Sequence, residues 1–87
     1  MALISVRTPR FKKKFEQLPE NIQELAYKNF VLWKMDQSHP SLCFKLLKGT
    51  DFWSIRIGDH YRGVGYWNHE KFIWIWIGSH AEYDHRF

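Results

Sequence analysis

The chain is poor in the features that mark secreted or membrane proteins. Its one cysteine, Cys43, allows no internal disulfide and fits a reducing compartment. The longest uninterrupted apolar run covers residues 72–77, whereas a membrane-spanning helix needs about 20 apolar residues. The first residues show no signal-peptide pattern. We therefore expect a cytoplasmic protein without a membrane partner.

What the chain does contain favours a small folded domain with a polyanionic or acidic partner. Hydrophobic residues make up 45% and aromatic residues 18% of the 87 residues, which predicts one globular domain over residues 1–87. The net charge is +4. Residues 1–48 carry nine Lys or Arg against four Asp or Glu, and the remainder carries four against five. Such a basic half favours RNA or an acidic protein as partner.

The first half of the sequence predicts a short strand and two helices. Residues 4–7 form the strand, and Thr8 followed by Pro9 is typical of a helix start, because threonine caps free amides and proline lacks one. Pro19 starts a second helix that runs to about Gln37. We expect these helices to form a hairpin across a sheet.

The second half predicts four strands, at residues 44–47, 52–57, 61–67 and 71–77. The short turns between them indicate an antiparallel meander. The last strand is apolar on both faces, so it is expected inside the sheet, covered on both sides and paired with the first strand. The predicted fold is α+β, with two N-terminal helices on a small, mostly antiparallel twisted sheet in the order β-α-α-β-β-β-β.

Two arginines flank one predicted turn. Arg56 lies near the end of one strand and Arg62 near the start of the next, so both guanidinium groups are expected at one end of the sheet. Guanidinium groups bind phosphate through two parallel hydrogen bonds. The alternative is that they pair with Asp59, Asp84 or a backbone carbonyl.

Polar side chains follow the last strand. His80 lies two residues after Gly78, and Tyr83 follows. Histidine donates and accepts protons near neutral pH, although a single histidine is more often structural or simply exposed. A metal site built from His80, Glu82, Asp84 and His85 is disfavoured, because the sequence has neither paired cysteines nor a helix-spaced histidine pair. We expect no metal and no cofactor, and nothing ties Cys43 to a base.

Other residues extend the basic surface. Lys45 and Lys48 flank an apolar pair and either add to the phosphate-binding face or are solvated charges. Residues 12–14 are most simply the wet face of a helix, although they are able to assist RNA binding. Most of the aromatic side chains must fill the core, and Tyr83 is the best placed of them to stack on a base.

The order of elements and three sequence segments resemble the RelE/ParE toxin superfamily. The segments are LKG at 47–49, RIGDHYR at 56–62 and IGSHAEYD at 77–84. The nearest branch is that of the RelE-type mRNA interferases, and the ending is similar to that of YafQ-like toxins. This resemblance implies the toxin of a type II toxin–antitoxin system, a metal-independent endoribonuclease that cuts mRNA on the ribosome. It also implies an acidic, partly disordered antitoxin that forms a hetero-oligomer with the toxin.

The resemblance also implies roles for individual residues. Arg56 and Arg62 would hold the phosphate, His80 would act as general acid, and Tyr83 would orient or stack the substrate. Further substrate-binding candidates are Lys45, Lys48, His60, His85 and Arg86. The chain departs from RelE where that toxin has two lysines before its arginine, because Ser54 and Arg56 stand here and leave no evident general base.

Two other functions fit the same fold. One is a ParE-like inhibitor of DNA gyrase, which needs no acid or base. The other is a non-catalytic module that binds RNA or protein. His80 together with Arg56 and Arg62 favours the nuclease, because such a group has no evident task in gyrase binding.

Overall fold

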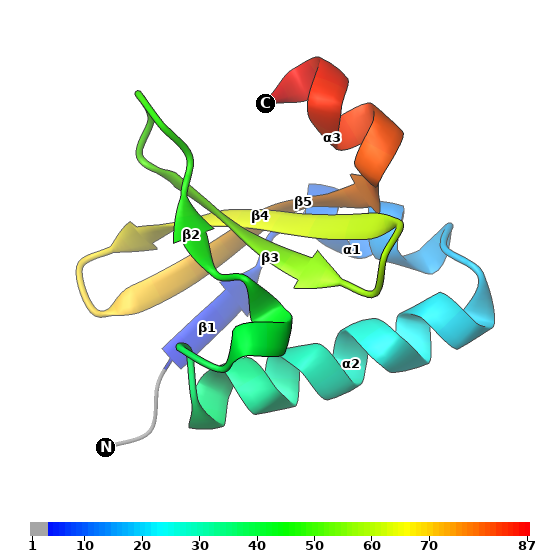
Figure 1. The fold of residues 1–87 in the computed structure, drawn as a ribbon, viewed down its shortest axis with the longest axis horizontal. Helices are drawn as coiled ribbons and strands as arrows, with labels where there is room; N and C mark the ends of the chain where they lie inside the picture. The colour runs from blue at the N-terminus through cyan, green and yellow to red at the C-terminus, as the bar shows by residue number, and fades with distance from the viewer. Residues whose placement is uncertain (1–3) are drawn as a thin grey trace.

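The structure is a computed structural model that describes residues 4–87 (Figure 1). None of the helices in this range is long and apolar enough to cross a membrane. In chain order the elements are β1 (Ile4–Arg7), α1 (Pro9–Glu16), α2 (Glu20–Met35), the short 3₁₀ helix η1 (Pro40–Leu42), β2 (Lys45–Leu46), β3 (Phe52–Ile57), β4 (Tyr61–Asn68), β5 (Lys71–Ser79) and α3 (His80–Arg86).

The five strands form one sheet in the order β1-β5-β4-β3-β2. β1 pairs with β5 in parallel, and the other neighbours are antiparallel. The predicted α+β fold, the meander and the interior position of the last strand are therefore confirmed. β2 is shorter than predicted, and β5 continues two residues further, to Ser79.

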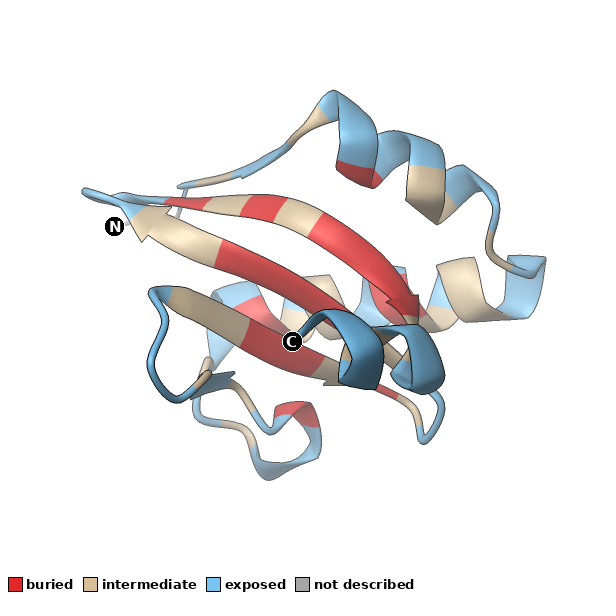
Figure 2. Ribbon diagram, turned by 90° about the horizontal axis from the view of Figure 1, so that it is seen from above, coloured by how far each residue is buried: buried red, intermediate tan, exposed pale blue. Residues whose placement is uncertain are grey.

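Both faces of the sheet are covered, as predicted for a last strand that is apolar on two sides. In Figure 1, α2 lies below the sheet and α3 above it. The main core lies on the α1 and α2 side, where Trp74 contacts the rings of Phe11, Phe30 and Trp33. Figure 2 shows that the buried residues gather along the middle of the strands, while most of α3 is exposed.

The predicted start of the first helix is confirmed. Thr8 has extended backbone angles, and its hydroxyl accepts a hydrogen bond from the amide of Phe11 at 3.2 Å. Pro9 is the first helical residue. The amide of Thr8 donates to the carbonyl of Trp74 at 3.1 Å, so the chain leaves β1 and enters α1 directly beside β5.

A β-bulge in β5 changes which face its side chains occupy. Val64 pairs with Trp76 and Gly65 pairs with Trp74, so Ile75 is an extra residue in the ladder. Strict alternation would place Trp74 and Trp76 on one face. Instead Trp74 contacts the core rings, whereas Trp76 contacts Tyr83 of α3.

The C-terminal helix α3 is absent from the predicted order of elements, which ended with the last strand. The hydroxyl of Ser79 accepts from the amide of Glu82 at 3.2 Å, and the Glu82 carboxylate accepts in return from the amide of Ser79. This reciprocal capping box satisfies two helix-start donors and begins the helix directly at the end of β5.

Candidate functional site

The two arginines singled out by the sequence lie opposite each other. Arg56 of β3 and Arg62 of β4 are partners in the antiparallel register. Side chains of directly opposite residues project from the same face of a sheet, and their Cβ atoms are about 4.5–5.5 Å apart. Like-charged side chains directly opposite each other destabilise a strand pair, and an anion bound between them would offset this effect.

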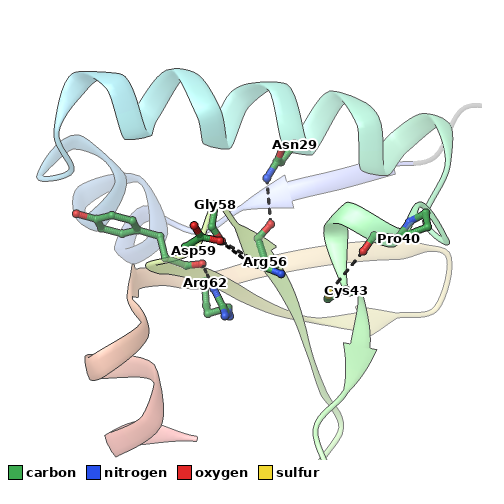
Figure 3. A network of polar contacts seen from close by, with 8 residues as sticks. Asn29, Pro40, Cys43, Arg56, Gly58, Asp59 and Arg62 are labelled. Atoms are coloured by element: carbon green, nitrogen blue, oxygen red, sulfur yellow. Dashed lines mark hydrogen bonds and ion pairs between the residues drawn. The ribbon is translucent and has the colours of Figure 1, made fainter.

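The two guanidinium groups differ in their protein partners. Arg56 donates through Nη2 to Oδ1 of Asp59 at 2.5 Å and through Nε to the carbonyl of Gly58 at 3.0 Å (Figure 3). Arg62 donates through Nη1 to the carbonyl of its neighbour Tyr61 at 2.7 Å. Because a guanidinium group has five donor hydrogens, Arg62 keeps most of its donors for a ligand.

The pairing expected as an alternative for these arginines is thus present in part. The hydrogen bond that Arg56 donates to Asp59 raises the pKa of Arg56 above its ordinary value, and the side chain of Cys43 adds to this effect. Asp84 has a different partner from the one considered, since its Oδ1 lies 3.4 Å from Nε2 of His80. The Arg56–Asp59 ion pair is largely exposed and therefore weak. A phosphate group is able to compete with the Asp59 carboxylate for Arg56.

His80 lies at the same end of the sheet as the arginines. Gly78, two residues before it, is the register partner of Arg62. The amide of His80 also donates to the carbonyl of His60 in the β3–β4 turn at 2.7 Å. This bond ties the start of α3 to the turn that carries the arginines. The imidazole of His80 is 47% exposed, so it is open to a ligand.

Tyr83 lies one turn of α3 beyond His80 and is half-buried. Its ring lies nearly parallel to that of His80, with the centroids 6.1 Å apart, and 6.4 Å from the ring of Trp76. The tyrosine therefore supports one side of the His80 imidazole. Phe87 completes the contact of α3 with the sheet by packing on Trp76 and Phe52.

Sequence reasoning missed the contact that joins α3 to α1. The sequence predicted residues 12–14 as the solvated face of a helix that is able to assist RNA binding. In the structure, Nζ of Lys14 lies 3.5 Å from Oε2 of Glu82 and 5.4 Å from the centroid of the Trp76 ring. The hydrogen bond from the amide of Ser79, helped by the charge of Lys14, lowers the pKa of Glu82. The Ser79-x-x-Glu82 spacing was a visible signal for the helix, whereas nothing in the sequence indicated the partner Lys14.

Of the other substrate-binding candidates, some lie near the two arginines and some do not. Lys45 pairs with Ser54, two residues from Arg56, and so projects from the arginine face. His60 lies in the turn between the arginines. Lys48 lies in the β2–β3 turn at the other end of β3. His85 and Arg86 lie in the last turn of α3, away from His80.

Ser54 and Cys43 have no chemical role in the predicted site, and they differ in exposure. Ser54 is 2% exposed and therefore does not reach a substrate. Cys43 is exposed, and its thiol faces the carbonyl of Pro40 at 3.5 Å. Among residues 4–87 no three His, Cys, Asp or Glu side chains form a group able to hold a metal ion.

The structure is similar to solved toxin structures. RelE in the RelB–RelE antitoxin–toxin complex of Methanococcus jannaschii superposes with a TM-score of 0.74 at 20% identity, covering 94% of this chain and 99% of that one. A mutant of Escherichia coli toxin RelE in the free state gives 0.69 at 21% identity, covering 90% and 83%. The archaeal RelE–RelB complex of Pyrococcus horikoshii gives 0.70 at 16% identity, covering 91% and 96%.

These similarities show that the chain has the RelE fold. No protein-family model matches the sequence, and no curated protein matches it significantly. The fold expected from the three sequence segments is therefore confirmed by structure rather than by sequence similarity.

Proposed function

We propose that this protein is the toxin of a type II toxin–antitoxin system and cleaves mRNA on the ribosome. The observation that carries the proposal is that Arg56 and Arg62 are register partners and that the amide of His80 is bonded to the turn between them, with its imidazole exposed. Cationic side chains that face a phosphate, with a proton donor next to them, are what RNA cleavage without a metal ion requires. The RelE fold supports the same assignment.

In the proposed reaction the 2′-hydroxyl oxygen of one nucleotide attacks its own 3′-phosphorus. The new phosphorus–oxygen bond forms as the bond to the 5′-oxygen of the next nucleotide breaks. The products are a 2′,3′-cyclic phosphate and a 5′-hydroxyl group. One proton leaves the 2′-hydroxyl and one proton reaches the 5′-oxygen, so no oxidant, metal or cofactor takes part.

The residues divide these tasks. Arg62 and Arg56 bind the non-bridging phosphate oxygens and stabilise the negative charge that builds up on them. His80, in its protonated form, delivers the proton to the 5′-oxygen. His60 is our candidate to accept the proton of the 2′-hydroxyl, since it lies in the turn whose carbonyl holds the His80 amide. Tyr83 keeps the His80 ring in place and offers its exposed edge to a base.

The other basic candidates serve as contacts to the RNA strand. Lys45 lies on the arginine face and is placed to bind a phosphate next to the scissile one. Lys48 and His85 lie further away and add sequence-independent attraction to the polyanion. The reaction would take place in the cytoplasm, where mRNA is translated.

An acidic antitoxin, partly disordered when free, is the proposed protein partner. RelE proteins of Methanococcus jannaschii and Pyrococcus horikoshii were crystallised with RelB. An acidic chain that orders on binding would cover Arg56, Arg62 and His80 in a hetero-oligomer, and would thus compete with RNA for the same charges.

The proposal is tested on translating ribosomes that carry a defined message. The wild-type protein should cut the message within codons, whereas His80→Ala and Arg62→Ala should leave it intact. Lys34→Ala, in the last turn of α2 on the other side of the sheet from α3, is the control and should cut normally. Growth arrest with intact message would contradict the proposal and favour a gyrase inhibitor or a non-catalytic binding module.

A further inference from the structure

Besides the arginine pair, the surface has a basic hollow at the edge of the sheet, where β1 ends before β5 does. β1 ends at Arg7, opposite Trp74, so the edge of β5 beyond Trp74 has no neighbouring strand among the described residues. The start of α1 borders this part of the β5 edge on one side, and the end of α3 borders it on the other. The hollow measures about 510 Å³, and its lining consists of Thr8, Arg10, Ile75, Trp76, Arg86 and Phe87.

The charged side chains that line this hollow are both arginines. Arg10 is the second residue of α1, and Arg86 is the last residue of α3. Both are exposed, and neither takes part in an ion pair within residues 4–87. No acidic residue lines the hollow. Two guanidinium groups without carboxylate partners are suited to a phosphate group.

The floor between the arginines is apolar and aromatic. Ile75, the bulge residue, is half-buried, and Phe87 is 41% exposed. Trp76 is 2% exposed, and its indole Nε1 is a buried donor without a hydrogen-bond partner. An exposed aromatic edge beside arginines is the combination that holds a base and its phosphate in single-stranded RNA.

We infer that this hollow is a second nucleotide-binding site, which holds a base against Phe87 and Ile75 and its phosphate between Arg10 and Arg86. The inference rests on the proposed RNA substrate. The hollow and the Arg56–Arg62 pair lie at opposite ends of α3, which spans about 10 Å at 1.5 Å per residue. A single RNA strand is therefore able to occupy both sites by running along α3. The volume fits one nucleotide, since ligand pockets of about 300–1,000 Å³ bind small molecules.

The site is tested by binding rather than by cleavage. The probe is a short fluorescent single-stranded RNA with 2′-O-methyl groups, which cannot undergo the proposed reaction. The variant is Arg10→Gln with Arg86→Gln, and the charge-matched control is Lys28→Gln with Lys34→Gln on α2, below the sheet. Arg10→Gln alone serves as a second variant, because Arg86 also stabilises the last turn of α3. Fluorescence anisotropy gives the dissociation constant at several salt concentrations.

The double variant should raise the dissociation constant about tenfold or more and reduce the salt slope by about 0.7, because that is the share of one neutralised phosphate in a single strand. Arg10→Gln alone should raise the dissociation constant by a smaller factor. Equal binding by the double variant and the α2 control would overturn the inference. So would unchanged RNA binding combined with lost binding of a poly-glutamate peptide, which would assign the hollow to an acidic protein.

Failure of the inference is distinguishable from failure of the proposed function. If wild-type protein never cuts RNA but the double variant still binds it more weakly than the control, the site stands and the nuclease does not. If the wild type cuts message and the double variant binds like the control, the nuclease stands and the site does not.

Discussion

Arg56 and Arg62 face each other across the β3–β4 ladder, and Arg56 alone of the two also pairs with a carboxylate, that of Asp59, within residues 4–87. This arrangement holds two like charges together with one counter-charge. The sheet therefore keeps an excess positive charge at this end when no ligand is bound. An anion is the natural complement, and the site is built at some cost to the unliganded fold.

Removal of one of the two facing arginines should relieve this cost to the unliganded fold. Arg62→Gln should leave the unliganded protein as stable as the wild type or more stable by up to about 1 kcal/mol, because it relieves a like-charge cross-strand pair. Inorganic phosphate should raise the melting temperature of the wild type more than that of the variant, which keeps only the hollow beside Arg10 for phosphate. Thermal unfolding with and without phosphate measures both effects, with Lys34→Gln as control. A variant less stable than the wild type would show that Arg62 serves the fold instead.

Asp59 should restrain Arg56 rather than support catalysis. Asp59→Asn removes the carboxylate that competes with phosphate for Nη2, so binding of a non-cleavable RNA should become tighter. Stability should change by no more than about 1 kcal/mol, since exposed ion pairs contribute little. Anisotropy titrations measure the binding. Weaker RNA binding by Asp59→Asn would mean that the carboxylate positions Arg56 for the substrate.

The contact of α3 with the sheet should loosen in acid. The pKa of Glu82 is lowered in the folded protein, chiefly by the amide of Ser79. The ionised Glu82 therefore stabilises the folded protein fully above the ordinary pKa of glutamate. This contribution is lost as the pH falls through the lowered pKa of Glu82. The protection factors of the α3 amides against hydrogen exchange should therefore fall in that range.

Two variants separate this effect from general acid unfolding. Glu82→Gln should abolish the pH dependence of α3 exchange, whereas Asp84→Asn, on the same helix, should keep it. Equal pH profiles for Glu82→Gln and wild type would rule out Glu82 as the group responsible.

The packing of the Trp76 ring should require glycine at position 78. A Cβ atom at Gly78 would lie 2.7 Å from Cζ2 and 2.9 Å from Cη2 of the Trp76 ring, so the ring must shift. We expect Gly78→Ala to cost about 1–3 kcal/mol, as overpacking does, and to expose α3 to exchange. Gly49→Ala is the control, because it meets no atom within 4 Å and strains only its own turn at φ +78°. Normal protection of α3 in Gly78→Ala would contradict this packing.

Much of this fold was predictable because its signals are local. Thr8 and Pro9 mark a helix start by their own chemistry. The short turn at residues 58–60 sets the register of its two strands, and this register pairs Arg56 with Arg62. The Ser79-x-x-Glu82 spacing carried the same kind of local signal for α3. It was overlooked because the polar residues after β5 were interpreted as chemical groups rather than as a helix.

Other features depend on contacts that no local pattern contains. The bulge at Ile75 turns Trp76 to the other face of the sheet, and alternation alone predicts the opposite. The pair Lys14 and Glu82 joins two helices that are distant in the sequence. The hollow beside Arg10 exists because β1 is shorter than β5, which is a property of the assembled sheet.

The most direct test of the nuclease proposal uses a message with one 2′-O-methyl nucleotide at the position of cleavage. The proposed reaction needs the 2′-hydroxyl as nucleophile, so wild-type protein should cut the unmodified message on ribosomes and leave a 2′,3′-cyclic phosphate. The modified message should stay intact at that position. Equal cutting of both messages, or growth arrest with neither cut, would contradict the account.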